Sequence, residues 1–147
     1  MPPSIHYWNY PTEIFCGAEA LHGLAQRCAL LGMARPLLVT DPGMLELEPF
    51  GLLTAHLEQS RQGFAVFAEL ASNPSLDDVQ RGVQAFRAGG HDSLIALGGG
   101  SAMDAAKGIA LAAVDPQGLQ RFEWSRVIEH YPSLSDFPRL GLPPLIA

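Results

Sequence analysis

The 147-residue sequence predicts an α/β fold in which a parallel sheet carries helices on both faces. Predicted strands and helices alternate three times along the chain, and this alternation favours a parallel sheet covered on both sides. The predicted strands are short, continuous apolar runs, as in sheets buried on both faces. Apolar residues make up 48% and charged residues 16% of the chain, so its length and composition fit one globular domain.

The first half of the chain supplies two helices around one strand. Apolar residues recur at helical intervals over residues 18–31, and Gly32 is suited to end that helix. The run PLLVT (36–40) is the first predicted strand, and it ends at the turn residues Asp-Pro-Gly (41–43). A second helix is predicted over about 49–62.

The second half of the chain continues the same rhythm. Residues 64–70 are predicted as a strand, and Ser75 as the N-cap of a helix that ends at the glycine pair 89–90. The run SLIAL (93–97) is the third predicted strand, and a helix follows over about 101–114.

The periodicity fades after Asp115. The stretch GLQRFEW (118–124) predicts a short helix, and the proline-punctuated residues 130–144 predict a loop. The final PPLIA (143–147) resembles the first residues of another strand. Because natural chain ends are more often exposed and polar, we expect this chain to be truncated.

The stretch GGGS (98–101) lies where the third predicted strand gives way to a helix. Glycine lets the backbone approach another group closely, and the helix presents unpaired N–H groups and the positive end of its dipole. Together they predict an anion site suited to a pyrophosphate, to which Ser101 adds a hydroxyl donor and a helix cap. The stretch matches neither a Walker A loop nor GxGxxG, because Lys107 comes too late and Met103 replaces the last glycine. The alternative is a tight turn in which glycine only permits close packing.

Three linked segments carry a resemblance to a known family. The stretch GGGSAMDAAKGIAL (98–111) resembles the GGGSxxDxAK signature of the iron-containing (group III) alcohol dehydrogenase family. PLLVTDPGM (36–44) is similar to that family's first nucleotide-binding strand and its terminal Asp-x-Gly, and FAELASNPS (67–75) to its segment ending in NP(T/S). The segments follow in the family's order and spacing and cover most of residues 10–115.

The resemblance implies six residues that contact a nicotinamide dinucleotide: Asp41, Asn73, Gly99, Gly100, Ser101 and Asp104. Asp41 would bind the adenosine ribose and repel a 2′-phosphate, so NAD is expected in preference to NADP. Asn73 would reach the phosphates or the nicotinamide ribose, and the two glycines with Ser101 would hold the pyrophosphate. Asp104 would face the same cleft one helical turn further along.

Three of these residues also have plainer interpretations. Asp41 suits a turn that binds nothing, and Asn73 suits an Asx turn before Pro74. Asp104 lies three residues before Lys107, which is the spacing of an ordinary helix ion pair.

The activity that the resemblance implies is the reversible oxidation of a small alcohol to an aldehyde or ketone, with NAD as hydride acceptor. In this family an all-helical C-terminal domain holds Fe²⁺ or Zn²⁺, which polarises the substrate oxygen. We expect that domain to be missing from this chain, and residues 1–147 to be a Rossmann-like NAD-binding α/β domain, inactive alone, without catalytic or metal-binding residues. The histidines show no ligand spacing and are expected on surface or helix faces: His6, His22, His56, His91 and His130.

The charge of the chain restricts its partners. A net charge of −6 without a Lys/Arg cluster argues against nucleic acid and anionic membranes. The sequence shows no apolar run of bilayer length and no signal-peptide pattern, so we expect a cytoplasmic protein, and we also expect a homo-oligomer. Two alternatives stay open: a non-catalytic nucleotide-binding or assembly module, and another superfamily member such as glycerol dehydrogenase, maleylacetate reductase or a dehydroquinate synthase-like enzyme.

Overall fold

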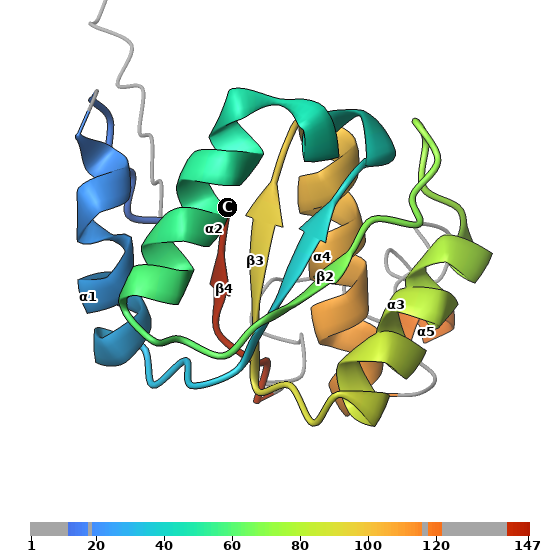
Figure 1. The fold of residues 1–147 in the computed structure, drawn as a ribbon. Helices are drawn as coiled ribbons and strands as arrows, with labels where there is room; N and C mark the ends of the chain where they lie inside the picture. Colours follow the sequence, from blue (N-terminus) through green and yellow to red (C-terminus); the bar gives the residue numbers. More distant parts are fainter. Residues whose placement is uncertain (1–11, 18, 116–117, 122–140) are drawn as a thin grey trace, which may run out of the picture.

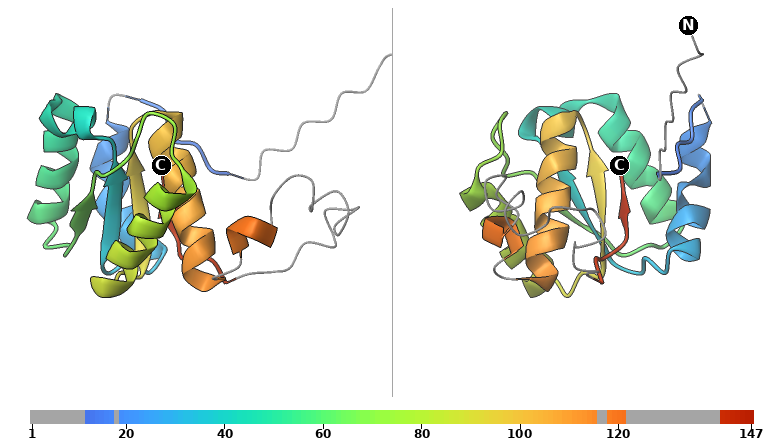
Figure 2. Two further views of the ribbon diagram at one scale, coloured as in Figure 1. Left: turned by 90° about the vertical axis from the view of Figure 1, so that its right-hand side faces the viewer. Right: turned by 180° about the vertical axis from the view of Figure 1, so that it is seen from behind.

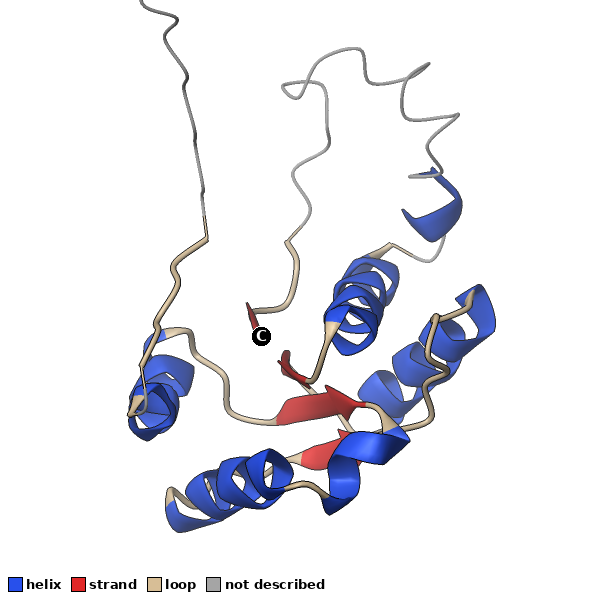
Figure 3. Ribbon diagram, turned by 90° about the horizontal axis from the view of Figure 1, so that it is seen from above, coloured by secondary structure: helices blue, strands red, loops and turns tan. Residues whose placement is uncertain are grey.

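A parallel sheet with helices packed against both faces forms the molecule (Figure 1, Figure 3). The structure is a computed structural model that describes residues 12–17, 19–115, 118–121 and 141–147. The predicted α/β class is confirmed. His6, His130, the second half of the predicted helix at 118–124 and most of the predicted loop at 130–144 lie outside the described residues.

The strands stand in the order β2-β1-β3-β4, and all neighbours pair in parallel. In the described part of the chain, the strands are β1 (Pro36–Thr40), β2 (Ala65–Phe67), β3 (Ser93–Leu97) and β4 (Leu145–Ile146). The predicted strands at 36–40 and 93–97 are confirmed to the residue, and they pair along their whole length. The strand expected in PPLIA is confirmed as β4, which lies beside β3 (Figure 2).

The strand predicted over 64–70 is shorter than expected, because its partner ends. Phe67 pairs with Val39, and β1 ends one residue later at Thr40. Beyond that point the chain has no ladder to extend, so residues 68–75 leave the sheet and turn over its carboxyl end.

The helices lie in pairs on the two faces of the sheet. One face carries η1 (Ala20–Gly23), α1 (Leu24–Leu30) and α2 (Glu48–Gln59), and the other carries α3 (Leu76–Ala88) and α4 (Gly100–Val114). The short helix α5 (Gly118–Arg121) follows α4, and the turn expected after β1 opens the 3₁₀ helix η2 (Pro42–Glu46). The helix expected over 18–31 is divided into two segments, the 3₁₀ helix η1 and the α-helix α1.

Successive side chains of the central strands enter two different cores. Leu37 and Val39 pack with α3 and α4, whereas Leu38 between them packs with α1 and α2. Ile95 of β3 joins Leu38 on the α1–α2 side. Each of these side chains is at most 2% exposed, and burying one such side chain is worth about 1.5–3 kcal/mol. The uninterrupted apolar runs of the sequence thus serve both faces of the sheet.

Close contact between α3 and α4 depends on Gly82. A Cβ on this residue would lie 2.7 Å from Cγ1 of Ile109 and 3.2 Å from Cε1 of Phe67. Both of those side chains are buried, so neither can move far. Ser75 is the N-cap of α3, as predicted. It forms a capping box that was not predicted: its side chain accepts from the Asp78 backbone N–H, and the Asp78 carboxylate accepts from the Ser75 N–H.

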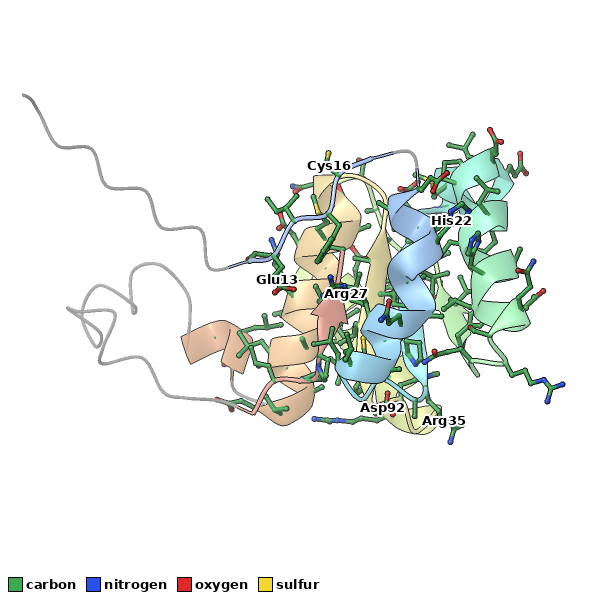
Figure 4. The ribbon with its side chains drawn as sticks, turned by 90° about the vertical axis from the view of Figure 1, so that its left-hand side faces the viewer. Glu13, Cys16, His22, Arg27, Arg35 and Asp92 are labelled. Atoms are coloured by element: carbon green, nitrogen blue, oxygen red, sulfur yellow. The ribbon has the colours of Figure 1, made fainter. Side chains whose placement is uncertain are left out.

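Asp92 ties the connection before β1 to the start of β3. Its carboxylate accepts hydrogen bonds from the backbone N–H groups of Ala34 and Arg35, each at 3.0 Å, and from the Ser93 hydroxyl at 2.6 Å. Arg35 and Asp92 lie together at the edge where the strands begin (Figure 4). Burial raises the pKa of Asp92, but the bonds from Ser93, Arg35 and Ala34 outweigh it and hold the pKa below its usual value.

Two glycine substitutions should have opposite effects on stability. Gly82→Ala forces a Cβ into the contact between α3 and α4, and we expect the free energy of unfolding to fall by about 1–3 kcal/mol. Gly51→Ala is the control, because among the described residues nothing lies within 4 Å of its Cβ position in α2, and alanine should stabilise that helix by about 0.5–1 kcal/mol. Urea unfolding followed by circular dichroism measures both. A Gly82→Ala protein as stable as wild type would contradict the tight helix contact.

Acid should weaken the fold through Asp92 and Asp78. The backbone N–H and the hydroxyl of Ser75, and then Arg81, lower the pKa of Asp78, as the contacts above do for Asp92. Because both pKa values lie below those of the unfolded chain, the stabilisation is complete above about pH 5 and is lost as the pH falls through the folded values. We expect Asp92→Asn to reduce stability at neutral pH and to flatten its decline below pH 5.

Urea titrations at several pH values test this expectation, with Asp77→Asn as the control. Asp77 is exposed in the first turn of α3, next to Asp78. Equal acid sensitivity in Asp92→Asn and wild-type protein would contradict the role given to Asp92.

Candidate functional site

A hollow of about 350 Å³ opens at the carboxyl edge of the sheet. In Figure 1 the strands end toward the top, where β1 passes into η2 and β3 passes into α4. In open α/β folds, ligands bind outside this edge. The hollow is lined by residues from three connections: Asp41, Pro42, Leu70, Ser72, Gly99 and Ser101.

The ends of β1 and β3 meet at the floor of this region. The Thr40 hydroxyl, fully buried, donates to the Leu97 carbonyl at 2.7 Å and satisfies it where the ladder stops. Gly98 follows with a φ of +140°, a conformation that L-residues rarely adopt. A Cβ here would lie 3.2 Å from Oδ2 of Asp41 and 3.2 Å from Cβ of Ala102. The absence of a side chain at Gly98 therefore lets the β1 end approach α4.

Asp41 is held in place by the backbone that follows it. It is the N-cap of η2, and its Oδ1 accepts a hydrogen bond from the Met44 N–H at 3.1 Å. The half-buried carboxylate lines the hollow at the end of β1. This is the position from which an acidic group can accept hydrogen bonds from a ribose.

The amino end of α4 offers backbone donors to the hollow. The N-cap is Gly99, which has no side chain with which to cap the helix, and α4 continues for 15 residues. Among the described residues, nothing lies within 4 Å of a Cβ position on Gly99 or Gly100. Gly99 and Ser101 line the hollow, so the amino end of α4 and the positive end of its dipole lie beside it, the arrangement that favours an anion.

Ser101 differs from the prediction in one respect. It was expected to cap the helix, but it is the second residue of α4, and its hydroxyl donates to the Ser72 carbonyl. The two residues are 29 positions apart in the chain. The hydroxyl is therefore used to join the two walls of the hollow, which no local pattern in the sequence indicates.

The structure brings only part of the predicted set together. Asp41, Gly99 and Ser101 line the hollow, whereas Gly100 lies beside it and Asn73 is exposed in the turn next to Ser72. The lining residues Pro42, Leu70 and Ser72 were missed; the turn chemistry of Asp-Pro-Gly and Ser-Asn-Pro-Ser was the available signal.

Asp104 lies outside the lining of the hollow and pairs with Lys107. The ammonium nitrogen is 3.3 Å from Oδ1, and the Asp104 and Lys107 side chains are both well exposed. The helix ion pair that the spacing indicated is confirmed, and a cofactor contact for Asp104 stays a prediction.

The described residues contain no group of three or more His, Cys, Asp or Glu side chains placed to hold a metal ion. His22 is exposed. His56 and His91 are half-buried, and a ring nitrogen of each is hydrogen-bonded to a backbone carbonyl. In the same ranges of the chain, none of the helices has the length and apolar character needed to traverse a bilayer.

The strand order and the hollow at the strand ends define a Rossmann-like α/β fold. Comparison with known proteins makes this more specific: the model of the iron-containing alcohol dehydrogenase family matches residues 11–145. The chain belongs to the iron-containing alcohol dehydrogenase family.

Individual relatives agree with this assignment. The 4-hydroxybutyrate dehydrogenase of Cupriavidus necator is 40% identical over 106 residues, which cover 71% of this chain and 27% of that protein. A crystal structure of 1,3-propanediol oxidoreductase superposes with a TM-score of 0.70 at 28% identity, covering 88% of this chain and 31% of the other. The maleylacetate reductase of Agrobacterium tumefaciens superposes with a TM-score of 0.61 at 29% identity, covering 76% and 30%. The chain thus spans less than a third of the length of these relatives.

Alanine substitutions at two neighbouring glycines should have unequal effects on stability, because Gly98 has a positive φ and a crowded Cβ position and Gly99 has neither in the described part of the chain. Gly98→Ala places a Cβ at a φ of +140° beside Asp41, and we expect a loss of about 1–3 kcal/mol in the free energy of unfolding. Gly99→Ala, at a φ of −82° with open space before it, should change stability by no more than about 0.5–1 kcal/mol. Equal losses in the two variants, measured by urea unfolding, would contradict the close approach at Gly98.

Proposed function

We propose that this chain is the NAD-binding part of an oxidoreductase that interconverts a small alcohol with its aldehyde or ketone. One observation carries the proposal: the amino end of α4 and the carboxylate of Asp41 face one hollow at the carboxyl edge of the sheet. Membership of the iron-containing alcohol dehydrogenase family supports it independently.

The described residues fit the middle of a dinucleotide. The hollow is smaller than a whole dinucleotide, so it would receive the pyrophosphate and the adjoining ribose. The pyrophosphate would lie against the N–H groups at Gly99 and Gly100, where a Cβ would meet open space and the backbone can be reached closely. Ser101 would contribute through its backbone, because its hydroxyl already bonds to Ser72.

Asp41 would set the preference between the two nicotinamide cofactors. Its carboxylate can accept hydrogen bonds from both ribose hydroxyls, whereas a 2′-phosphate would bring a second negative charge against it. The bond from Met44 holds the carboxylate in place before the ligand arrives. We therefore propose NAD as the cofactor and NADP as the weaker ligand.

The chemistry of the reaction comes from groups beyond those described. When bound, the nicotinamide ring supplies the hydride acceptor or donor. The residues of this chain bind the cofactor and orient it, and we assign no catalytic role to any of them. The family name implies iron, but the described residues do not provide a ligand set for it, so no step is derived through a metal.

The substrate class follows from the names of the relatives. 4-Hydroxybutyrate and 1,3-propanediol are short chains with a terminal hydroxyl group, and a primary alcohol of this kind is the substrate we propose. A maleylacetate reductase-like activity is the second candidate, because that enzyme superposes on 76% of the chain at 29% identity. Assays of the full-length gene product with both substrate types separate the two.

Calorimetric titration of the chain with NAD⁺ and NADP⁺ tests the cofactor assignment. We expect NAD⁺ to bind more tightly than NADP⁺. Asp41→Ala should weaken NAD⁺ binding roughly ten- to hundredfold, because a hydrogen bond to a charged group is worth about 1.5–3 kcal/mol. The same variant should narrow the difference between the cofactors, since the repulsion of the 2′-phosphate is gone.

Glu58→Gln is the matched control, because this carboxylate is exposed near the end of α2 and is not part of the hollow. It should bind NAD⁺ as the wild type does. Binding of NAD⁺ that is equal in wild type and Asp41→Ala would remove the assigned role of Asp41. Wild-type chain that is folded and binds neither cofactor would overturn the proposed function.

A further inference from the structure

Residues 69–75 form one wall of the hollow, to which Leu70 and Ser72 contribute. The segment follows β2 and precedes α3, and it belongs to neither element. The backbone of residues 69–74 is therefore not fixed by a ladder or by helical hydrogen bonds, and only the Ser75 carbonyl accepts a helical bond, from the Val79 N–H. Side chains from neighbouring elements must hold it if the hollow is to keep its shape.

Arg81 of α3 holds the start of this wall. Its Nη2 donates to the Glu69 carbonyl oxygen at 3.2 Å, and its Nε lies 3.6 Å from Oε2 of the same residue. The same guanidinium also donates to Oδ1 of Asp78. Arginine suits this task because its fixed, planar fork of N–H donors can serve several acceptors at once.

The end and the middle of the wall are held by other side chains. At the end, the Ser75 N–H donates to Oδ2 of Asp78 at 2.7 Å, and the Asp78 N–H donates to the Ser75 hydroxyl at 3.2 Å. In the middle, the Ser101 hydroxyl donates to the Ser72 carbonyl. Ser75, Asp78 and Arg81 follow one another at intervals of three, so they share one side of the first turns of α3.

We propose that Arg81 is a positioning residue for the hollow: it fixes the wall formed by residues 69–75, so that the cavity is shaped before a dinucleotide enters. The role in binding rests on the proposed function, whereas the ordering of the wall does not. A wall that is already ordered favours binding, because no free energy of binding is then lost in ordering it.

The effect on binding is separable from an effect on folding. The Arg81 and Glu69 side chains are 46% and 73% exposed, and ion pairs of this kind add little to stability. Arg81 also pairs with the buried Asp78, but Asp78 keeps its hydrogen bonds with Ser75 when Arg81 is replaced. Arg87, on the same helix, provides a matched comparison. Its Nη2 donates to the carbonyls of Ala112 and Ala113, at the carboxyl end of α4 and away from the hollow.

The experiment compares Arg81→Met with Arg87→Met by hydrogen–deuterium exchange and by NAD⁺ titration. We expect Arg81→Met to speed amide exchange in residues 69–73 and to weaken NAD⁺ binding by roughly three- to tenfold, the range for ordering a few side chains and a short loop. Arg87→Met should leave both within twofold of wild type. Arg81→Lys keeps the charge and stem and should restore part of the affinity, because one ammonium cannot replace the fork.

The outcomes distinguish this proposal from the proposed function. Unchanged exchange in residues 69–73 of Arg81→Met overturns the positioning role, whatever the titration shows. Faster exchange with unchanged NAD⁺ affinity also overturns it, because the wall would then not matter for binding. If wild-type chain binds no NAD⁺, the proposed function fails and the exchange data alone decide whether Arg81 orders the wall. If Arg81→Met does not fold, Arg81→Lys takes its place in both measurements.

Discussion

The candidate site depends on the close approach of two strand ends. Parallel pairing sets Thr40 beside Leu97, and the Thr40 hydroxyl satisfies the Leu97 carbonyl at the point where the ladder ends. Immediately beyond, Gly98 adopts a φ of +140° and leaves room for Asp41. The strand pairing and the backbone conformation of Gly98 thereby bring the Asp41 carboxylate and the amino end of α4 to one place. This part of the site is fixed by the scaffold, whereas the wall formed by residues 69–75 depends on side-chain contacts with its neighbours.

The rest of the fold keeps these strand ends rigid. The carboxylate of Asp92 holds the opposite edge, where β1 and β3 begin, and the two cores clamp both faces of the pair. On the α3–α4 side, Gly82 allows the helices to pack closely enough for Ile109 to be fully buried. Displacing β1 along β3 by one residue would turn Leu38 toward the wrong core. The register, and with it the position of Asp41, is therefore strongly specified.

The sequence predicts the central strands better than the walls of the site. The runs at 36–40 and 93–97 are confirmed to the residue, because continuous apolar character is itself the signature of a strand buried on both faces. The strand at 64–70 was overestimated because its length is limited by where β1 ends, which is a tertiary fact. The Ser101 hydroxyl was predicted to cap the helix because Ser101 stands where the predicted helix begins, but the acceptor lies at Ser72 in another connection. Contacts between distant connections leave no periodic trace in a single sequence.

An acidic chain can still provide an anion site, because the field that matters there is local. The net charge is −6, but the amino end of α4 presents backbone N–H groups whose partial positive charge acts over a few ångströms. More distant carboxylates are screened by solvent ions at about 8–10 Å, so they influence the rate of encounter more than the bound state. Asp41 is the exception because it lines the same hollow. Its charge is partly offset by the Met44 N–H. The proposed role of Asp41 follows from what remains of that charge at the end of β1: a ribose would use it as an acceptor, and an additional phosphate would be repelled. The Asp41 carboxylate beside the amino end of α4 is thus consistent with the proposed binding of a pyrophosphate and with the proposed preference for NAD over NADP.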